Sequence, residues 1–270
     1  MFTMKIFRLD ALLLLLAQGG WAADVVILNR PHSDFDQRDE YSTQLLQHAL
    51  ARTVAEYGPY EIRTSGYVME RGQFASSPAS TLGFRAELDR MLIELKRGEL
   101  INVTAQPTRP EWEAQLIPVR IPLDKGLFSY RISLIRQEDQ AKFAAIRSLE
   151  ELKRQPLGIS PTWTVHRIFK QAGFNLVEGF TYDGLFEMLR AGRFSHLSRA
   201  LYEAPLEFES RKGNFPELAI EKTLMLYFLQ PRYFFVSPKH PKLAERIERG
   251  LNLMIRDGSF DQIFLDYHRP

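Results

Sequence analysis

The sequence predicts an α/β protein built as two lobes. Short apolar or alternating segments typical of strands alternate with segments of helical periodicity, and this alternation occurs twice, on either side of a mainly extended stretch at 117–136. Such alternation is typical of mainly parallel sheets with crossover helices. A chain of 270 residues, 45% of them hydrophobic, is long enough to bury one sizeable core or two modest ones.

The composition excludes several classes of protein. Charged residues make up 25% of the chain and aromatic residues 12%, which excludes a disordered or collagen-like chain. The formal net charge is +2 and there is no basic block, so the clustered positive patch that nucleic-acid binding needs is not visible. Because the chain has no cysteine, disulfides, thiolate metal sites and thiol nucleophiles are excluded.

The first 23 residues have the order of a secretory signal peptide. Lys5 and Arg8 precede the apolar run 11–17, and the segment ends in small residues at Ala23. Residues 18–20 (Gln-Gly-Gly) end the apolar run well short of the about 20 residues that a membrane-spanning helix needs, which disfavours a membrane anchor. We therefore expect cleavage at residue 22 or 23, export of the chain, and no later membrane-spanning segment.

The first alternation begins immediately after this segment. The apolar run 24–28 predicts a buried strand, and helical periodicity follows until Gly58-Pro59 ends it. Later elements are predicted by the same criteria: a strand at 60–67, a helix with its apolar stripe at 84–95, and a strand at 101–104.

The second alternation begins with a capped helix at 148–153 and a strand at 156–159. Ser160-Pro161 then has the pattern of an N-cap followed by proline at the first helical position, and Gly173 ends that helix. The remaining predicted elements are a helix at 184–191, a strand at 193–197, extended segments at 223–228 and 233–236, a helix at 243–254 and a short helix at 260–267.

No motif of a known catalytic or metal site is present. The six histidines are scattered and form no H-E-x-x-H pair or tight cluster of metal ligands. The sequence also lacks a G-x-S-x-G elbow, a G-x-x-x-x-G-K phosphate loop and a G-x-G-x-x-G dinucleotide motif. An enzyme is therefore not excluded, but no motif favours one, and we expect no metal or cofactor.

Several segments form a pattern by their order and spacing. In the first half, Thr108 to Glu113 runs into 118–123. In the C-terminal half, the segments are 148–152 (Ser-Leu-Glu-Glu-Leu), 185–194 (Leu-Phe-x-Met-Leu-x-x-Gly-Arg-Phe), 232–236 (Arg-Tyr-Phe-Phe-Val) and 243–264. In these segments the chain resembles the periplasmic solute-binding proteins that serve polar amino-acid uptake, known as family 3.

This resemblance implies a two-lobed, type II periplasmic-binding-protein-like fold, also called a Venus flytrap, in a periplasmic monomer. Lobe 1 would comprise 24–128 plus 232–270 and lobe 2 would comprise 129–231, with crossing strands near 126–130 and 229–233 as the hinge. The ligand would lie between the lobes, where the carboxyl ends of strands and helix N-termini converge. Closure of the lobes would bury it.

The first departure from the family pattern is at Trp112. Family members that bind α-amino acids clamp the ligand carboxylate with an arginine in a Thr-x-x-x-Arg-Glu stretch, and Trp112 occupies the place of that arginine. A tryptophan can stack on a ring or a cation but cannot pair with a carboxylate. Arg109 would substitute only if its loop is re-aimed, and the alternative is that Trp112 merely packs the surface between the lobes.

The second departure is at Arg199. The corresponding family strand often ends in an aspartate that holds the ligand ammonium, whereas a cation there would favour an anion. The alternative is that Arg199 forms a surface ion pair with Glu203, four residues on. The turn at Ser160 and Thr162 would offer backbone donors and hydroxyls to an anionic group, or would serve only as a helix cap.

These observations predict an exported solute-binding protein without catalytic activity, which captures a small polar or anionic solute for an ABC permease or for the ectodomain of a signalling receptor such as a sensor kinase. Its preferred ligand would carry an acidic group near Arg199 and a flat or apolar part against Trp112, and free polar amino acids would bind weakly or not at all. The candidate ligand-binding residues are Arg30, Gln106, Thr108, Arg109, Trp112, Ser160, Thr162, Arg199 and Glu203.

Two other classes stay open. One is an enzyme on the same scaffold, similar to cyclohexadienyl dehydratases, for which Glu203 and His196 are the candidate acid–base residues. The other is a degenerate pair of lobes that binds only a protein partner, which would also explain the missing arginine.

Overall fold

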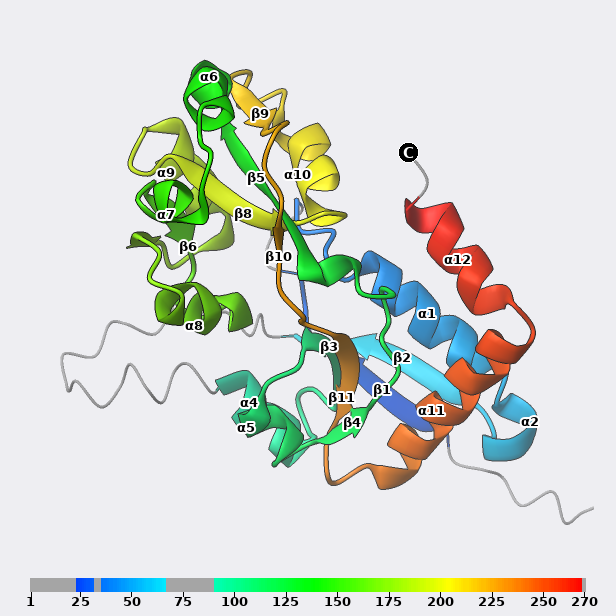
Figure 1. Cartoon of the computed structure of the whole chain (residues 1–270). Helices are drawn as coiled ribbons and strands as arrows, with labels where there is room; N and C mark the ends of the chain where they lie inside the picture. The colour runs from blue at the N-terminus through cyan, green and yellow to red at the C-terminus, as the bar shows by residue number, and fades with distance from the viewer. Residues whose placement is uncertain (1–22, 32–34, 67–89, 269–270) are drawn as a thin grey trace, which may run out of the picture.

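The computed structural model describes residues 23–31, 35–66 and 90–268, and within them it shows two bodies of sheet and helix (Figure 1). One body contains a two-stranded sheet, β1–β2, and a three-stranded sheet, β3–β11–β4; we call it lobe 1. The other contains a six-stranded sheet in the order β10–β5–β8–β6–β7, with β9 also paired to β5; we call it lobe 2. The two-lobed α/β architecture expected from the sequence is therefore present.

Three expectations fall partly outside the described residues. They are the signal peptide at residues 1–22, the strand expected at 60–67 at residue 67, and the helix expected at 84–95 at residues 84–89. Among the residues that the structure describes, no helix is long and apolar enough to cross a membrane.

Lobe 1 contains segments from both the N-terminal and the C-terminal parts of the described chain. The apolar run Asp24–Leu28 forms β1, which pairs in parallel with β2 (Tyr60–Thr64), as strand–helix alternation predicts. The strand β11 (Arg232–Val236) enters from lobe 2 and inserts antiparallel between β3 (Val103–Pro107) and β4 (Ile117–Val119). The helices of lobe 1 are α1 (Glu40–Ala51), α2 (Val54–Tyr57), α4 (Arg90–Arg97), α5 (Pro110–Glu113), α11 (Pro241–Arg256) and α12 (Ser259–His268).

Lobe 2 is built around β5 (Tyr130–Arg136), which is antiparallel to β8 (His196–Ala200). The strand β6 (Leu157–Ile159) runs parallel to β8 and to β7 (Leu176–Glu178). The remaining elements are the 3-10 turns η1 (Leu127–Ser129) and η2 (Gln137–Asp139), the helices α6 (Gln140–Ala144), α7 (Leu149–Lys153), α8 (Thr164–Gln171), α9 (Tyr182–Arg190) and α10 (Glu203–Arg211), and the strands β9 (Leu218–Ile220) and β10 (Leu226–Tyr227).

Two local predictions in lobe 2 differ from the structure. The helix expected from Ser160-Pro161 begins instead at Thr164, because the backbone N–H of Trp163 donates to the Ser160 carbonyl at 3.0 Å and closes a turn first. The strand expected at 193–197 lies at 196–200, because Gly192 (φ +70°) and the bond from the Arg193 N–H to the Met188 carbonyl form the cap that ends α9. Arg199 consequently lies inside a strand and not beyond its end.

The packing of α11 on α1 depends on one glycine. A Cβ added at Gly250 would lie 2.2 Å from the carbonyl oxygen of Ala49 and 2.6 Å from its carbonyl carbon. Because these are backbone atoms, no side-chain rotation could relieve the overlap, and α11 and α1 would have to separate. Both helices contribute buried residues to the main core of lobe 1, among them Leu46, Leu50 and Leu251.

We expect Gly250→Ala to lower the free energy of unfolding by roughly 2–3 kcal/mol, the usual cost of overpacking a well-filled core. Gly213→Ala is the matched control, because a Cβ there meets no atom within 4 Å. Urea denaturation of both variants measures the difference, and equal stabilities would show that α1 and α11 do not need this close approach.

Candidate functional site

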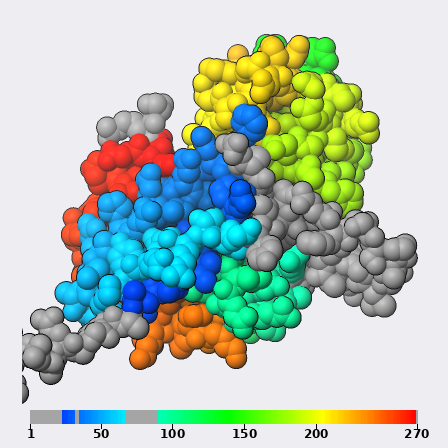
Figure 2. Space-filling model, turned by 180° about the vertical axis from the view of Figure 1, so that it is seen from behind, coloured from blue at the N-terminus to red at the C-terminus, as the bar shows by residue number. Residues whose placement is uncertain are grey.

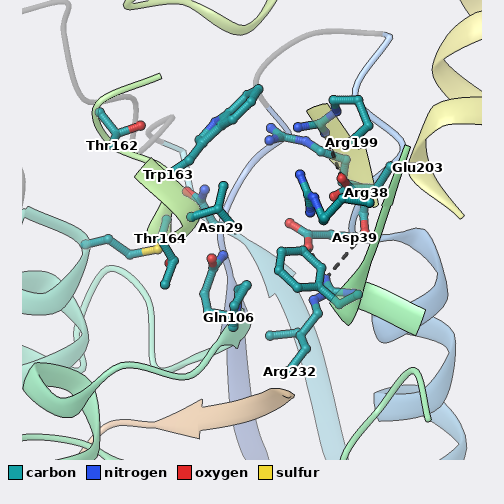
Figure 3. Close-up of a pocket in the computed structure, with 16 residues that line it drawn as sticks. Asn29, Arg38, Asp39, Gln106, Thr162, Trp163, Thr164, Arg199, Glu203 and Arg232 are labelled. Atoms are coloured by element: carbon teal, nitrogen blue, oxygen red, sulfur yellow. Dashed lines mark hydrogen bonds and ion pairs between the residues drawn. The ribbon is translucent and has the colours of Figure 1, made fainter. Parts of the chain in front are cut away.

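A cavity of about 120 Å³ lies between the two lobes. Lobe 1 lines it with Asn29, which follows β1, with Gln106 on β3, and with Arg232 on β11 (Figure 3). Lobe 2 contributes the turn Thr162–Thr164 and the charged pair Arg199 and Glu203 (Figure 3). A cavity of about 150 Å³ holds one benzene-sized molecule, so this volume matches one small solute.

Charge dominates the lining. Four arginines, Arg38, Arg131, Arg199 and Arg232, contribute to it, against the carboxylates of Asp39 and Glu203. The apolar part of the lining comes mainly from Met91, Phe128, Trp163 and Val165. A small solute with a polar or charged group and an apolar part would find partners for both.

Arg199 belongs to a buried ion cluster and not to the surface pair considered above. It is 2% exposed, and its Nε and Nη2 donate to Glu207 at 2.6 and 2.5 Å, with Glu203 Oε2 3.1 Å from Nη2. Burial alone would lower the pKa of Arg199, but Glu203 and Glu207 outweigh burial and raise it above its usual value. Because two carboxylates already balance its charge, the expectation that Arg199 supplies the free cation for an anionic ligand is not supported.

The pairing within this cluster also keeps Glu203 ionised. Burial would raise its pKa, but Arg199 and Arg131, together with the Ala200 N–H that donates to Oε2 at 3.0 Å, hold it below its ordinary value. Tyr182 closes the cluster by donating its hydroxyl to Glu207 Oε1 at 2.8 Å.

Two of the other arginines at the cavity also have carboxylate partners. Arg38 donates from Nε and Nη2 to Asp36 at 2.6 and 2.7 Å. Arg232 donates from Nη2 to Asp39 Oδ1 at 2.8 Å (Figure 3). Arg131, on β5, differs from both: its Nη2 donates to the Ser198 carbonyl at 2.8 Å, and it forms no ion pair with any described carboxylate. Burial lowers the pKa of Arg131 to about 10, so it remains charged at neutral pH.

The two lobes touch around the cavity. The guanidinium of Arg38, in lobe 1, lies 4.3 Å from the ring centroid of Tyr182 on α9. Near the cavity's threonine turn, Arg167 on α8 pairs with Glu111 on α5 at 2.9 Å. Figure 2 shows blue residues of the segment that leads into α1 against the yellow and yellow-green surface of lobe 2. The structure is therefore a form in which the lobes are in contact beside the cavity.

Neither the models of known protein families nor the sequences of curated proteins match this chain. Solved structures do match it. A histidine kinase sensor domain with similarity to periplasmic binding proteins has a TM-score of 0.62 at 17% identity, covering 92% of this chain and 96% of that one. A substrate-binding protein of an amino-acid ABC transporter from Streptococcus pneumoniae, bound to L-arginine, has a TM-score of 0.59 at 13% identity, covering 91% and 93%.

A third match is an ancestral amino-acid-binding protein, a precursor of cyclohexadienyl dehydratase, with a TM-score of 0.59 at 14% identity over 92% of this chain and 96% of that one. The fold is that of the two-lobed periplasmic binding proteins. The fold expected from the resemblance is thus confirmed, and these identities establish likeness of fold alone.

The structure brings four of the predicted site residues together at the cavity of this binding-protein fold: Gln106, Thr162, Arg199 and Glu203. The other five do not line it. Arg30 is exposed after β1, and Ser160 is buried with its Oγ 2.7 Å from Thr162 Oγ1. Thr108 donates its hydroxyl to Glu113 at 2.6 Å within its own loop.

Trp112 lies in the interior of lobe 1 and not on the cavity or the surface between the lobes. It is 2% exposed and packs with Leu95, Ile101 and Phe235, whose ring centroid lies 5.3 Å from that of Trp112. The reason is local: α5 is a single turn, and Trp112 is its buried residue. The guanidinium of Arg109 lies 4.6 Å from the Trp112 ring centroid, so Arg109 does not replace the family's clamp at the cavity.

Sequence reasoning missed most of the residues that line the cavity, among them Arg38, Asp39, Arg131, Trp163 and Arg232. A signal was present for one of them, because Arg131 is a charged residue inside the predicted extended segment 126–136, immediately before the mainly apolar residues 132–135. Another signal was available for Trp163, which follows a turn before a helix. Nothing in the local sequence distinguished Arg38 or Arg232 from surface arginines.

His196, one of the two candidate acid–base residues for an enzyme, does not line the cavity. It is fully buried in β8, with Nδ1 3.0 Å from Ser133 Oγ, and burial lowers its pKa to about 4. Glu203 does line the cavity but is held by Arg199. The described residues contain no cluster of three or more side chains that could hold a metal ion.

We expect Glu207→Gln to lower the free energy of unfolding by roughly 3 kcal/mol, because it removes the carboxylate charge opposite a buried guanidinium. Glu209→Gln, on the same helix, is the control, since Glu209 is exposed and its pair with Lys212 contributes under about 1 kcal/mol. Thermal and urea unfolding measure both variants. Equal stabilities would mean that Arg199 finds a sufficient partner in Glu203 alone.

Stability should fall as the pH decreases from about 6.5 to about 4, in part because of His196. The unfolded chain protonates this histidine near its ordinary pKa of 6.5, whereas the folded chain does so only near 4. The unfolded state therefore binds more protons in that range, which favours unfolding by up to roughly 3 kcal/mol at the acid end. His196→Asn should flatten this slope, and an unchanged slope would mean that His196 titrates normally in the folded protein.

Proposed function

We propose that the protein is an exported solute-binding protein, which captures one small polar or anionic solute between its lobes and delivers it to a transporter or a receptor. In this proposal, lobe 1 comprises 24–128 plus 232–270, lobe 2 comprises 129–231, and residues 1–23 are removed on export. The observation that carries the proposal is the charged cavity between the lobes, which both lobes line and which matches one small solute in size.

Contacts around the cavity support capture by closure. Arg38 with Tyr182, and Arg167 with Glu111, link the lobes on different sides of the cavity, so a solute would enter by separation of these contacts. The Arg167–Glu111 pair is about half exposed on both sides and contributes little on its own. Contacts of a solute with both lobes would favour the closed form further.

The partner is a membrane protein in either version of the proposal. Similarity to a transporter's substrate-binding protein favours an ABC permease, and similarity to a sensor domain favours the ectodomain of a signalling receptor. A pull-down of membrane extracts with the ligand-loaded protein distinguishes a permease from a sensor kinase.

An enzyme on the same scaffold is the second candidate, favoured by the match to a dehydratase precursor. The position of His196 away from the cavity leaves Glu203 as its candidate acid–base group, and the ionised state of Glu203 suits a base better than an acid. A pair of lobes that binds only a protein partner is the third candidate. It predicts no thermal shift with any small molecule.

Isothermal titration of the purified protein with a panel of amino acids, organic acids, amides and sugars tests the proposal. We expect saturable binding of at least one compound at one site per chain, with no chemical change to that compound by mass spectrometry. Reproducible turnover of any compound would favour the enzyme. Absence of binding across the panel, with retention of the protein on a partner column, would favour the third candidate.

A further inference from the structure

Arg131, which lines the cavity, has two side-chain hydrogen-bond donors without an acceptor among the described residues. It is 2% exposed, its Nη2 donates to the Ser198 carbonyl at 2.8 Å, and its Nε and Nη1 are buried. Among the residues that the structure describes, neither Nε nor Nη1 has a hydrogen-bond partner. A buried guanidinium usually has acceptors for these donors, because it loses its hydration on burial.

The other cavity arginines cannot offer an equivalent charge. Arg38 is paired with Asp36, Arg199 with Glu207 and Glu203, and Arg232 with Asp39. Arg131 is thus the one of these four arginines without a hydrogen-bonded carboxylate among the described residues, although the charge of Glu203 acts on it at longer range and favours its charged form. Arg232, on the opposite lobe, adds one further buried donor without a partner among the described residues, its Nη1.

The surroundings of Arg131 are apolar on one side. Its guanidinium lies 5.0 Å from the ring centroid of Phe128, which also lines the cavity. Trp163 adds an indole to the lining, while Arg199 lies 4.5 Å from the centroid of that indole. In such surroundings a hydrogen bond between ions is stronger than in water, so an acidic group beside Arg131 would bind firmly.

We propose that Arg131 receives the acidic group of the solute, so that the preferred ligands are small organic acids whose apolar part contacts Phe128 and Trp163. This inference rests on the proposed function and specifies its ligand class. Arg131, on β5, thereby takes the role of anion partner that the sequence predicted for Arg199. Trp163 takes the role of flat contact surface that the sequence predicted for Trp112.

The same charges disfavour a zwitterion. The ammonium of an amino acid would require a carboxylate, and the two that line the cavity, Asp39 and Glu203, are already paired with Arg232 and Arg199. A simple acid should therefore bind more tightly than the amino acid of the same size.

Matched acids and amides test this inference by titration calorimetry: propionate against propionamide, benzoate against benzamide, and propionate against alanine. We expect at least one acid to bind, and its amide to bind roughly 30-fold or more weakly, because loss of one partner in a buried charged pair has at least that effect. Arg131→Met should weaken binding of the acid by a similar factor. Arg193→Met is the control, since it removes an exposed arginine of the same lobe that does not line the cavity.

A stability measurement separates binding from a structural role. Burying a charge without a hydrogen-bonded counterion is costly, and an apolar side chain of similar volume removes that cost. The ligand-free Arg131→Met protein should therefore melt at or above the temperature of the wild type, while losing the acid. A variant that melts well below the wild type would show that Arg131 is structural and would overturn the inference. The comparison of acid with amide on the wild type needs no variant.

The remaining outcomes distinguish the two proposals. If a neutral or cationic solute binds one-to-one and Arg131→Met leaves its affinity unchanged, the solute-binding function stands and the role of Arg131 is wrong. An acid and its amide that bind equally would lead to the same conclusion. If no compound of either panel binds, both proposals fail.

Discussion

The structure between the lobes depends on one constraint: buried guanidinium groups must find acceptors. Removing an arginine from water is costly unless a carboxylate or carbonyl replaces the lost hydration. Arg199 meets this requirement with Glu203 and Glu207, both on α10, and so ties that helix to β8. Arg232 meets it with Asp39, which ties β11 to the segment before α1. These pairs determine which guanidinium donors at the cavity remain without an acceptor.

The same constraint separates residues that hold the fold from residues that can recognise a ligand. A paired arginine supplies little attraction to a solute, because its field is already balanced at close range. Arg131 is held by one carbonyl and has no described carboxylate partner, so its charge remains available at the cavity. The attraction of such a site for a charged solute depends on which arginines already have carboxylate partners, and not on the number of arginines in the lining.

The cavity also shows why the fold and the ligand are separate questions. The chain has the fold of the two-lobed binding proteins, yet Trp112, which the sequence resemblance placed at the family's clamp position, is a core residue of lobe 1. Because α5 is one turn long and buries Trp112, this side chain does not reach the cavity. The charged and aromatic side chains that do line the cavity include those on β5, on β11 and in the turn before α8.

The sequence by itself determined the two-lobed α/β fold and many of its elements. Apolar periodicity, the glycine stops and the Ser148 cap, whose Oγ accepts from the Glu151 N–H at 3.2 Å, are local signals that tertiary packing did not override. Of the candidate ligand-binding residues chosen from the sequence, Gln106, Thr162, Arg199 and Glu203 line the cavity. Only the tertiary structure decided the partners of each charge and the side that each aromatic ring faces. Arg199 meets Glu207 because α10 folds back over β8, and Arg131 lacks a comparable partner because no described carboxylate is brought to it; neither outcome is encoded in the spacing of nearby residues.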